Sequence, residues 1–170
     1  TQTFFGEGIV AHVSMADPVC PVLRDKVAER VRACDITLHD NGTYICMEGP
    51  AFSSRAESNM YRQWGVSIIG MTACPEVKLA REAELRYATL ALSTDYDCWH
   101  EEEENVNVES VVEILQRNTA NVKRVLKHLI PELAKVPEDT QSPCDNALAH
   151  AIMTNRDIIP AETREKLDPI

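Results

Sequence analysis

The pattern of apolar and polar positions predicts alternating helices and strands along the first half of the chain. Apolar residues recur at helical spacing from Pro21 to Cys34, and Asp17 followed by Pro18 is a typical helix-start signal just before them. Residues 43–47 alternate after an Asn-Gly turn signal and therefore read as a strand. We expect a helix over 21–34 followed by a strand over 43–47.

The same alternation continues through the middle of the chain. Ser53 or Ser54 can cap a helix that stops at Gly65, and residues 66–71 form a short apolar strand. Thr72 or Pro75 opens the next helix. A continuous apolar run over 86–94 then predicts a strand that is covered on both faces. Strands separated by helices of this length favour an α/β layered fold with a largely parallel or mixed sheet.

A long helix is predicted in the last third of the chain. Asn107 is its candidate cap, and apolar residues at helical spacing form one face as far as Pro131. A weaker pattern suggests a short helix near 146–153, before a polar tail that contains several prolines.

Composition narrows the class of protein. The chain has 170 residues with a formal charge of −10 and no basic cluster, so a nucleic-acid partner is not expected. No apolar stretch reaches the roughly 18–20 residues that cross a bilayer, and the first residues lack the layout of a signal peptide. The six cysteines are scattered without a C-x-x-C pair, which is typical of reduced thiols. We therefore expect a cytoplasmic protein without membrane contact.

Two carboxylates, Asp95 and Asp97, follow directly after the apolar run. Ligands of open α/β sheets bind outside the carboxyl ends of strands, and residues two apart in an extended chain point to the same side. Such a pair can accept hydrogen bonds from an amino group and a ring N–H, which an adenine with a protonated N7 offers. The alternative is that Asp95 caps a turn and that Asp97 is only solvated.

Other candidate ligand contacts lie after the two earlier strands. Phe52 follows a Gly-Pro break, where its ring can stack on a base or pack in the core, and the hydroxyls of Ser53 and Ser54 are adjacent. Met71 and Thr72 end the second strand at a helix start, where Thr72 either favours an anion such as phosphate or is a plain cap. His12 has no Cys or carboxylate at ligand spacing, so we expect no metal site there.

Four motifs in a fixed order resemble one known family. They are "AHVSMADPVCPVLR", "GTYICMEGPAFSSRAES", "IIGMTACPEVKLAREA" and "STDYDCW". Together they are similar to the carboxyl-terminal part of the purine nucleoside phosphorylase family, in particular its methylthioadenosine phosphorylase branch. The resemblance implies a three-layer α/β/α phosphorylase-like fold with a mixed sheet whose amino-terminal part is missing. It also implies that 1–135 is the carboxyl-terminal part of a single phosphorylase domain and that 136–170 is an extension.

The reaction that the resemblance implies is phosphorolysis of S-methyl-5′-thioadenosine to adenine and S-methyl-5-thioribose 1-phosphate, a step of methionine and adenine salvage. Phosphate is a co-substrate, no metal or organic cofactor is implied, and the assembly is a homotrimer or a dimer of trimers (hexamer). Because the sugar passes through an oxocarbenium-like state, such an enzyme must hold phosphate beneath C1′ and stabilise the departing purine at N7.

Site residues follow from the same resemblance. Asp95 matches the aspartate beside N7, a role that needs a desolvated pocket, and Asp97 matches the one that marks 6-aminopurine specificity. Phe52 and Ser53 match the base-packing segment, and Thr94 lies near the sugar or base. The remaining matches are Met71 (ribose), Thr72 (phosphate), Val108, Val111 and Val112 (5′-methylthio pocket), and His12 (5′ pocket of the neighbouring subunit).

Two departures from the family pattern keep alternatives open. Ala51 stands where the family usually has Arg, and the glycine-rich phosphate loop and Arg-His-Gly motif of the family's amino-terminal part are not in this sequence. The chain is therefore expected to act together with an amino-terminal companion fragment. The alternatives are a phosphorylase for 6-oxopurine nucleosides or methylthioinosine, and a non-catalytic purine-binding or assembly subunit.

Overall fold

The computed structural model describes residues 1–100, 108–137 and 140–170. The chain divides into two compact units, and both are assembled from segments that are distant in the sequence. The first unit comprises residues 1–25, 72–89 and 136–170, and the second comprises residues 26–71 and 90–135.

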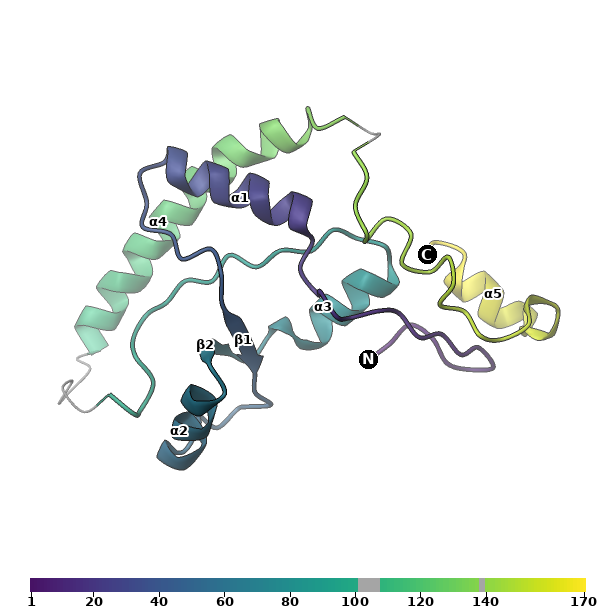
Figure 1. The fold of residues 1–170 in the computed structure, drawn as a ribbon, viewed down its shortest axis with the longest axis horizontal. Coiled ribbons are helices and arrows are strands. Elements are labelled where there is room, and N and C mark those ends of the chain that lie inside the picture. Colours follow the sequence, from purple (N-terminus) through teal and green to yellow (C-terminus); the bar gives the residue numbers. More distant parts are fainter. Residues whose placement is uncertain (101–107, 138–139) are drawn as a thin grey trace. The chain divides into compact units, whose positions relative to one another are not determined.

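A parallel pair of strands lies in the second unit (Figure 1). Strand β1 (Thr43–Cys46) pairs with β2 (Val66–Gly70), and helix α2 (Arg55–Gln63) connects them. The register runs from Thr43 opposite Val66 to Cys46 opposite Gly70, with one irregularity after Thr43. This β-α-β unit confirms the predicted alternation of strand and helix, and parallel pairing brings both carboxyl ends to one edge.

The ends of α2 are fixed by local chemistry. The Ser54 hydroxyl accepts a hydrogen bond from the Glu57 amide, and the Glu57 carboxylate accepts one from the Ser54 amide at 2.7 Å. In this capping box, the hydrogen bond from the Ser54 backbone amide lowers the pKa of the Glu57 carboxyl. The helix ends before Gly65, whose φ of 76° suits glycine. The structure confirms both predicted boundaries.

Helices α1 (Pro21–Ala33) and α4 (Val108–Leu133) lie side by side in Figure 1. In the second unit they are joined by an ion pair between Arg30 and Glu132, and the Arg124 guanidinium donates to the Cys34 carbonyl at 2.9 Å. Both helices were predicted, although α4 continues two residues past Pro131. The expected cap of α4, Asn107, lies outside the described residues. The buried apolar side chains on these helices are Ala28, Val31, Val125 and Leu129.

The predicted strand over 86–94 is wrong. These residues form no regular secondary structure, and Leu92 at the surface is 40% exposed. A strand requires a neighbouring backbone, and β1 and β2 pair only with each other among the described strands. The run makes scattered contacts instead: the Tyr87 carbonyl accepts from the Cys20 amide, and the Ser93 carbonyl accepts from the Asn118 side chain.

The first unit is organised around helix α3 (Ala73–Glu82). Cys74 has extended φ and ψ, so regular helix geometry begins at Pro75, one of the two predicted starts. Arg81 and Glu82 are buried at the other end of the helix. The Arg81 guanidinium donates to the carbonyls of Ser14 and Asp17, and the Glu82 carboxylate accepts from the Thr3 hydroxyl.

The carboxyl-terminal segment packs within the same unit. It contains a short 3₁₀ helix η1 (Arg156–Ile158) and helix α5 (Ala161–Leu167), which the sequence pattern did not predict. Residues 143–151 form turns rather than the short helix expected near 146–153. The Asp145 carboxylate pairs with the Arg86 guanidinium at 2.6 Å. The hydroxyl of Ser142 lies 3.2 Å from the thiol of buried Cys20.

None of the six cysteines, all of which lie within the described residues, forms a disulfide, and Cys20 and Cys144 are buried. Among the described helices, none has the length and apolar character of a membrane span.

Candidate functional site

The carboxyl ends of β1 and β2 form the base of the candidate site. The Met47 amide donates to the Gly70 carbonyl at 2.9 Å and so keeps the two chains together just beyond the strands. A Cβ at Gly49 would lie 2.7 Å from the Met71 sulfur, and Gly49 has a φ of 68°. The backbone angle favours glycine at this turn, and the absence of a side chain lets the Met71 sulfur approach it.

Phe52 and Ser53 project from the loop that follows this turn. The Phe52 side chain is 85% exposed, which removes the alternative that this ring is core packing. The Ser53 hydroxyl lies 3.5 Å from the sulfur of Met47. An exposed phenyl ring beside a strand end offers an apolar face to a flat ligand such as a base.

The two predicted carboxylates lie in a loop of the same unit. The Thr94 hydroxyl donates to Asp95 at 2.5 Å, and the Asp97 carboxylate accepts from the Cys98 amide at 2.8 Å. A turn closes with the His100 amide donating to the Asp97 carbonyl at 3.0 Å. Asp97 thus starts a turn, whereas the alternative assigned the turn to Asp95.

Burial differs between the two carboxylates. Asp97 is half-buried, whereas Asp95 is exposed. The expected desolvated environment of Asp95 is not present in the described part of this chain. A base stacked over the loop would be needed to exclude water from that carboxylate.

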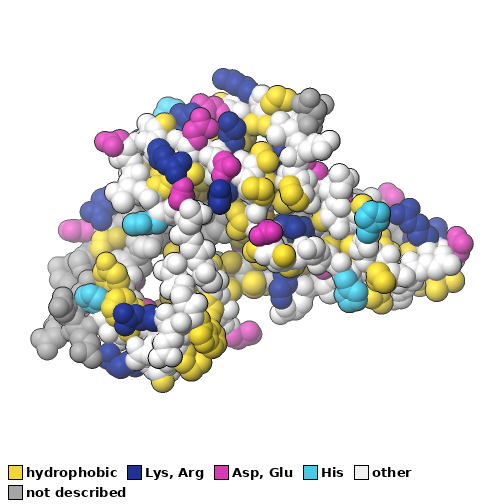
Figure 2. Space-filling model, viewed as in Figure 1, with side chains coloured by type: hydrophobic (Ala, Val, Ile, Leu, Met, Phe, Trp, Pro, Cys, Tyr) yellow, Lys and Arg dark blue, Asp and Glu magenta, His cyan; other side chains and the backbone are white. Residues whose placement is uncertain are grey.

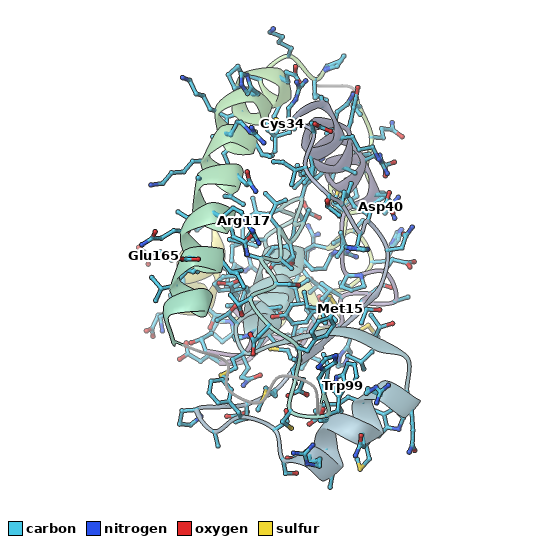
Figure 3. All side chains as sticks on the ribbon, turned by 90° about the vertical axis from the view of Figure 1, so that its left-hand side faces the viewer. Met15, Cys34, Asp40, Trp99, Arg117 and Glu165 are labelled. Atoms are coloured by element: carbon cyan, nitrogen blue, oxygen red, sulfur yellow. The ribbon has the colours of Figure 1, made fainter. Side chains whose placement is uncertain are left out.

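The carboxylate loop is attached to helix α2. The Cys98 thiol donates to the Ser53 carbonyl at 3.5 Å, at the start of α2. At the far end of α2 the Arg62 guanidinium lies 3.8 Å above the centre of the Trp99 ring. Figure 3 shows Trp99 beside this helix. The contact of Cys98 places the Asp97 loop next to Ser53, the neighbour of Phe52 in the sequence.

Arg62, Cys98 and Trp99 were missed by the sequence reasoning. The residue types alone carry no sign of these contacts, because an Arg in the last turn of a helix is common for electrostatic reasons. The sequence shows that Trp99 follows Asp97 by two residues, but this spacing does not indicate which residue the Trp99 ring contacts.

Several predicted site residues are not brought to this loop by any described contact. Thr72 is exposed and makes no side-chain capping bond to α3. Val112 is 44% exposed on α4, and the side chains of Val108 and Val111 lie outside the described residues. His12 belongs to the first unit. Their roles therefore stay predictions.

His12 lines a cavity of about 310 Å³ in the first unit. The carboxyl-terminal segment contributes part of the wall through Asn146 and His150, and Arg81 contributes another part. No group of three or more His, Cys, Asp or Glu side chains suited to a metal ion occurs within residues 1–100, 108–137 and 140–170.

Comparison with known proteins places the chain in a family. The sequence model of the Phosphorylase superfamily matches residues 1–131. S-methyl-5′-thioadenosine phosphorylase of Geobacter sulfurreducens is 50% identical over 169 residues, which cover 99% of this chain and 58% of the relative. The enzyme of the same name from Thermosynechococcus vestitus is 53% identical over 169 residues, with 98% and 58% covered. These alignments extend through the carboxyl-terminal segment.

Solved structures agree with these relatives. A methylthioadenosine phosphorylase from an Antarctic soil metagenomic library superposes with a TM-score of 0.91 at 45% identity, over 99% of this chain and 59% of that one. A variant of the Schistosoma mansoni adenosine/methylthioadenosine phosphorylase, solved with methylthioadenosine, superposes with a TM-score of 0.72 at 31% identity, over 81% and 54%. The chain spans less than three fifths of each of these four proteins. Its α/β elements are part of their shared fold, and the chain belongs to the phosphorylase superfamily.

Proposed function

We propose that this chain carries the purine-binding part of an enzyme that cleaves S-methyl-5′-thioadenosine with phosphate. The products are adenine and S-methyl-5-thioribose 1-phosphate. One observation carries the proposal: the loop of Asp95 and Asp97 is attached to the Phe52–Ser53 segment at the carboxyl edge of the parallel strands. The relatives named for this reaction are 50% and 53% identical to the chain.

The proposed chemistry stabilises the departing base. As a phosphate oxygen bonds to C1′, the bond from C1′ to N9 breaks and its electron pair moves to the purine, where a proton delivered to N7 through Asp95 neutralises the charge. Asp95 lies beside N7 in this proposal, and Asp97 accepts a hydrogen bond from the 6-amino group. The Cys98 amide occupies one position on an Asp97 oxygen, and a carboxylate has further acceptor positions for a ligand. The exposed Phe52 ring stacks on the base.

The other predicted residues complete the substrate site. Met71, held against Gly49, faces the ribose, and Thr94 lies near the sugar or base. Thr72, whose hydroxyl is not used for helix capping, contacts phosphate. The methylthio group fits against Val108, Val111 and Val112, with His12 supplied by a neighbouring subunit of a trimer or hexamer. The reaction needs phosphate as co-substrate and no metal or organic cofactor.

A companion polypeptide is part of the proposal. The chain spans 58% of the length of its relatives, and the phosphate loop of the family does not occur in its sequence. We therefore assign that loop to an amino-terminal portion that combines with this chain. The same observation favours one second candidate, a subunit that binds purines without phosphate chemistry.

The test is phosphate-dependent release of adenine from methylthioadenosine. The chain is assayed alone and mixed with the amino-terminal portion of the Geobacter sulfurreducens relative, each with and without phosphate. We expect release only from the mixture and only with phosphate. Adenine binding without release in any mixture would favour the purine-binding subunit. Neither binding nor release would contradict both candidates.

A further inference from the structure

The aromatic side chains around Asp97 form one cluster. The rings of Tyr96 and His100 stack with their centres 4.6 Å apart and their planes 14° apart. The Trp99 ring meets both of them edge to face, with centres 5.9 Å and 5.1 Å away. Tyr96 precedes Asp97 and the other two rings follow it. The cluster therefore fixes the backbone on both sides of this carboxylate.

Among the described residues, few other contacts constrain the loop that carries Asp97. Its short turn is closed by the bond from the His100 amide to the Asp97 carbonyl, and the Cys98 amide holds one carboxylate oxygen. These bonds shape the turn but attach it to nothing else. The direction in which Asp97 points relative to Phe52 therefore depends on the contacts between the loop and α2.

Helix α2 holds the loop at two points. A thiol is a weak hydrogen-bond donor, so the bond from Cys98 to the Ser53 carbonyl at 3.5 Å is a soft contact. The contact of Arg62 with Trp99 is a stronger type of interaction than this thiol hydrogen bond. A guanidinium within about 6 Å of an indole face is attracted by the ring quadrupole. The helix is a firm support, since its capping box and Gly65 fix both ends.

We infer that Arg62 is a positioning residue for purine recognition. Its guanidinium holds Trp99, and through the aromatic cluster it orients Asp97 toward a base that lies on Phe52. This role rests on the proposed function. The described contact of Arg62 is with Trp99, so the effect of Arg62 on the base is transmitted through that ring.

Tryptophan fluorescence gives a direct measure of this role. The sequence has two tryptophans, Trp64 and Trp99, so a Trp64→Phe background leaves emission from Trp99 alone. Purine affinities of this background protein are compared with those of Arg62→Met and Arg62→Lys. Arg55→Met is the matched control, because it removes the same charge from the exposed first turn of the same helix.

The expected loss of purine affinity depends on the positive charge at position 62 and differs between adenine and hypoxanthine. Arg62→Met should weaken adenine binding about tenfold, hypoxanthine binding by less, and shift Trp99 emission. Arg62→Lys should stay within about threefold of the parent, because its cation can still lie over the ring. Arg55→Met should bind like the parent. Unfolding temperatures identify any variant whose loss reflects misfolding.

A double-mutant cycle with Trp99→Leu, measured by calorimetry, keeps the inference falsifiable. If Arg62 acts through Trp99, Arg62→Met should add no further loss of adenine affinity in the Trp99→Leu protein. Additive losses, or unchanged adenine affinity in folded Arg62→Met, would overturn the positioning role while leaving the proposed function intact. A parent protein that binds no adenine would overturn the proposed function and this role together.

Discussion

Asp97 is the residue whose chemistry separates the substrate classes most sharply. Its half-buried carboxylate accepts a hydrogen bond from the Cys98 amide. A 6-amino group can donate to it, whereas a 6-oxo group is another acceptor and is repelled. An amide in the same place can donate to a carbonyl oxygen. The proposed role of Asp97 therefore predicts that the choice between Asp and Asn at this position decides between 6-amino and 6-oxo purines.

Asp97→Asn should lower kcat/KM for methylthioadenosine by roughly 10- to 100-fold, the usual cost of a lost charge-assisted hydrogen bond. Methylthioinosine should lose less. The measurement is a comparison of the two substrates with the assembled enzyme. An equal fall for both would show that Asp97 does not read the 6-position.

A substitution of Phe52 should affect adenine binding more than it affects the stability of the fold. Because the ring is 85% exposed, Phe52→Ala should change the free energy of unfolding by less than about 0.5 kcal/mol. Loss of a stacking partner should weaken adenine binding by about 1 kcal/mol, or roughly fivefold. Denaturation and adenine titration of the same preparation check both halves. A large loss of stability would mean that the ring is buried in the assembled protein.

At the scale of elements, the confirmed predictions rested on local sequence signals such as helix caps. The start of α2 could be predicted from Ser54 and Glu57, and its end from Gly65, because capping is a short-range interaction. The run over 86–94 failed because its apolar pattern indicates a strand only if another backbone lies beside it. The contact of Arg62 with Trp99 was not predictable, because it joins residues that are remote in the sequence.

Ser54→Ala tests the local account of α2. The substitution removes the hydroxyl that accepts from the Glu57 amide, and loss of such a cap costs about 1 kcal/mol of unfolding free energy. Ser53→Ala is the matched control, because the Ser53 hydroxyl contacts only the sulfur of Met47 among its described partners. Equal stability of both variants in urea denaturation would contradict the capping assignment.

The contact between Arg86 and Asp145 tests how the carboxyl-terminal segment is held in the first unit. A hydrogen bond from Arg86 lowers the pKa of the Asp145 carboxyl, so this pair stabilises the fold fully above the unfolded pKa of about 3.9. The contribution is lost as pH falls through the lower folded pKa. With roughly 30% of each side chain exposed, screening limits the contribution to about 1 kcal/mol.

Asp145→Asn should therefore lower the unfolding temperature at pH 7 and make it less sensitive to acid. The parent protein should approach the variant in stability as the pH falls from the unfolded pKa of about 3.9 through the lower folded pKa. Thermal unfolding of both proteins across pH 2.5–7 is the measurement. Parallel curves for the two proteins would show that the ion pair does not link this segment to the fold.

At the scale of the whole molecule, the two compact units carry different parts of the proposed enzyme. The second unit holds the residues that we propose to recognise the purine, and the first holds His12 and the carboxyl-terminal segment. The family could be predicted because four motifs of this sequence resemble it in a fixed order. The proposed roles of Thr72 at the phosphate and of His12 at a neighbouring subunit could not be derived from the residue pattern alone, because each depends on partners that lie far from these residues in the sequence or in another subunit.

Equilibrium binding of adenine tests the central claim most directly, because that claim concerns residues of this chain alone. Calorimetric titration is performed on the chain by itself and on its mixture with the amino-terminal portion of a relative, with hypoxanthine as the comparison. We predict one adenine per chain, weaker binding of hypoxanthine, and a selective loss of adenine affinity in Asp97→Asn. Equal affinity for both bases, or no adenine binding in either preparation, would contradict the account.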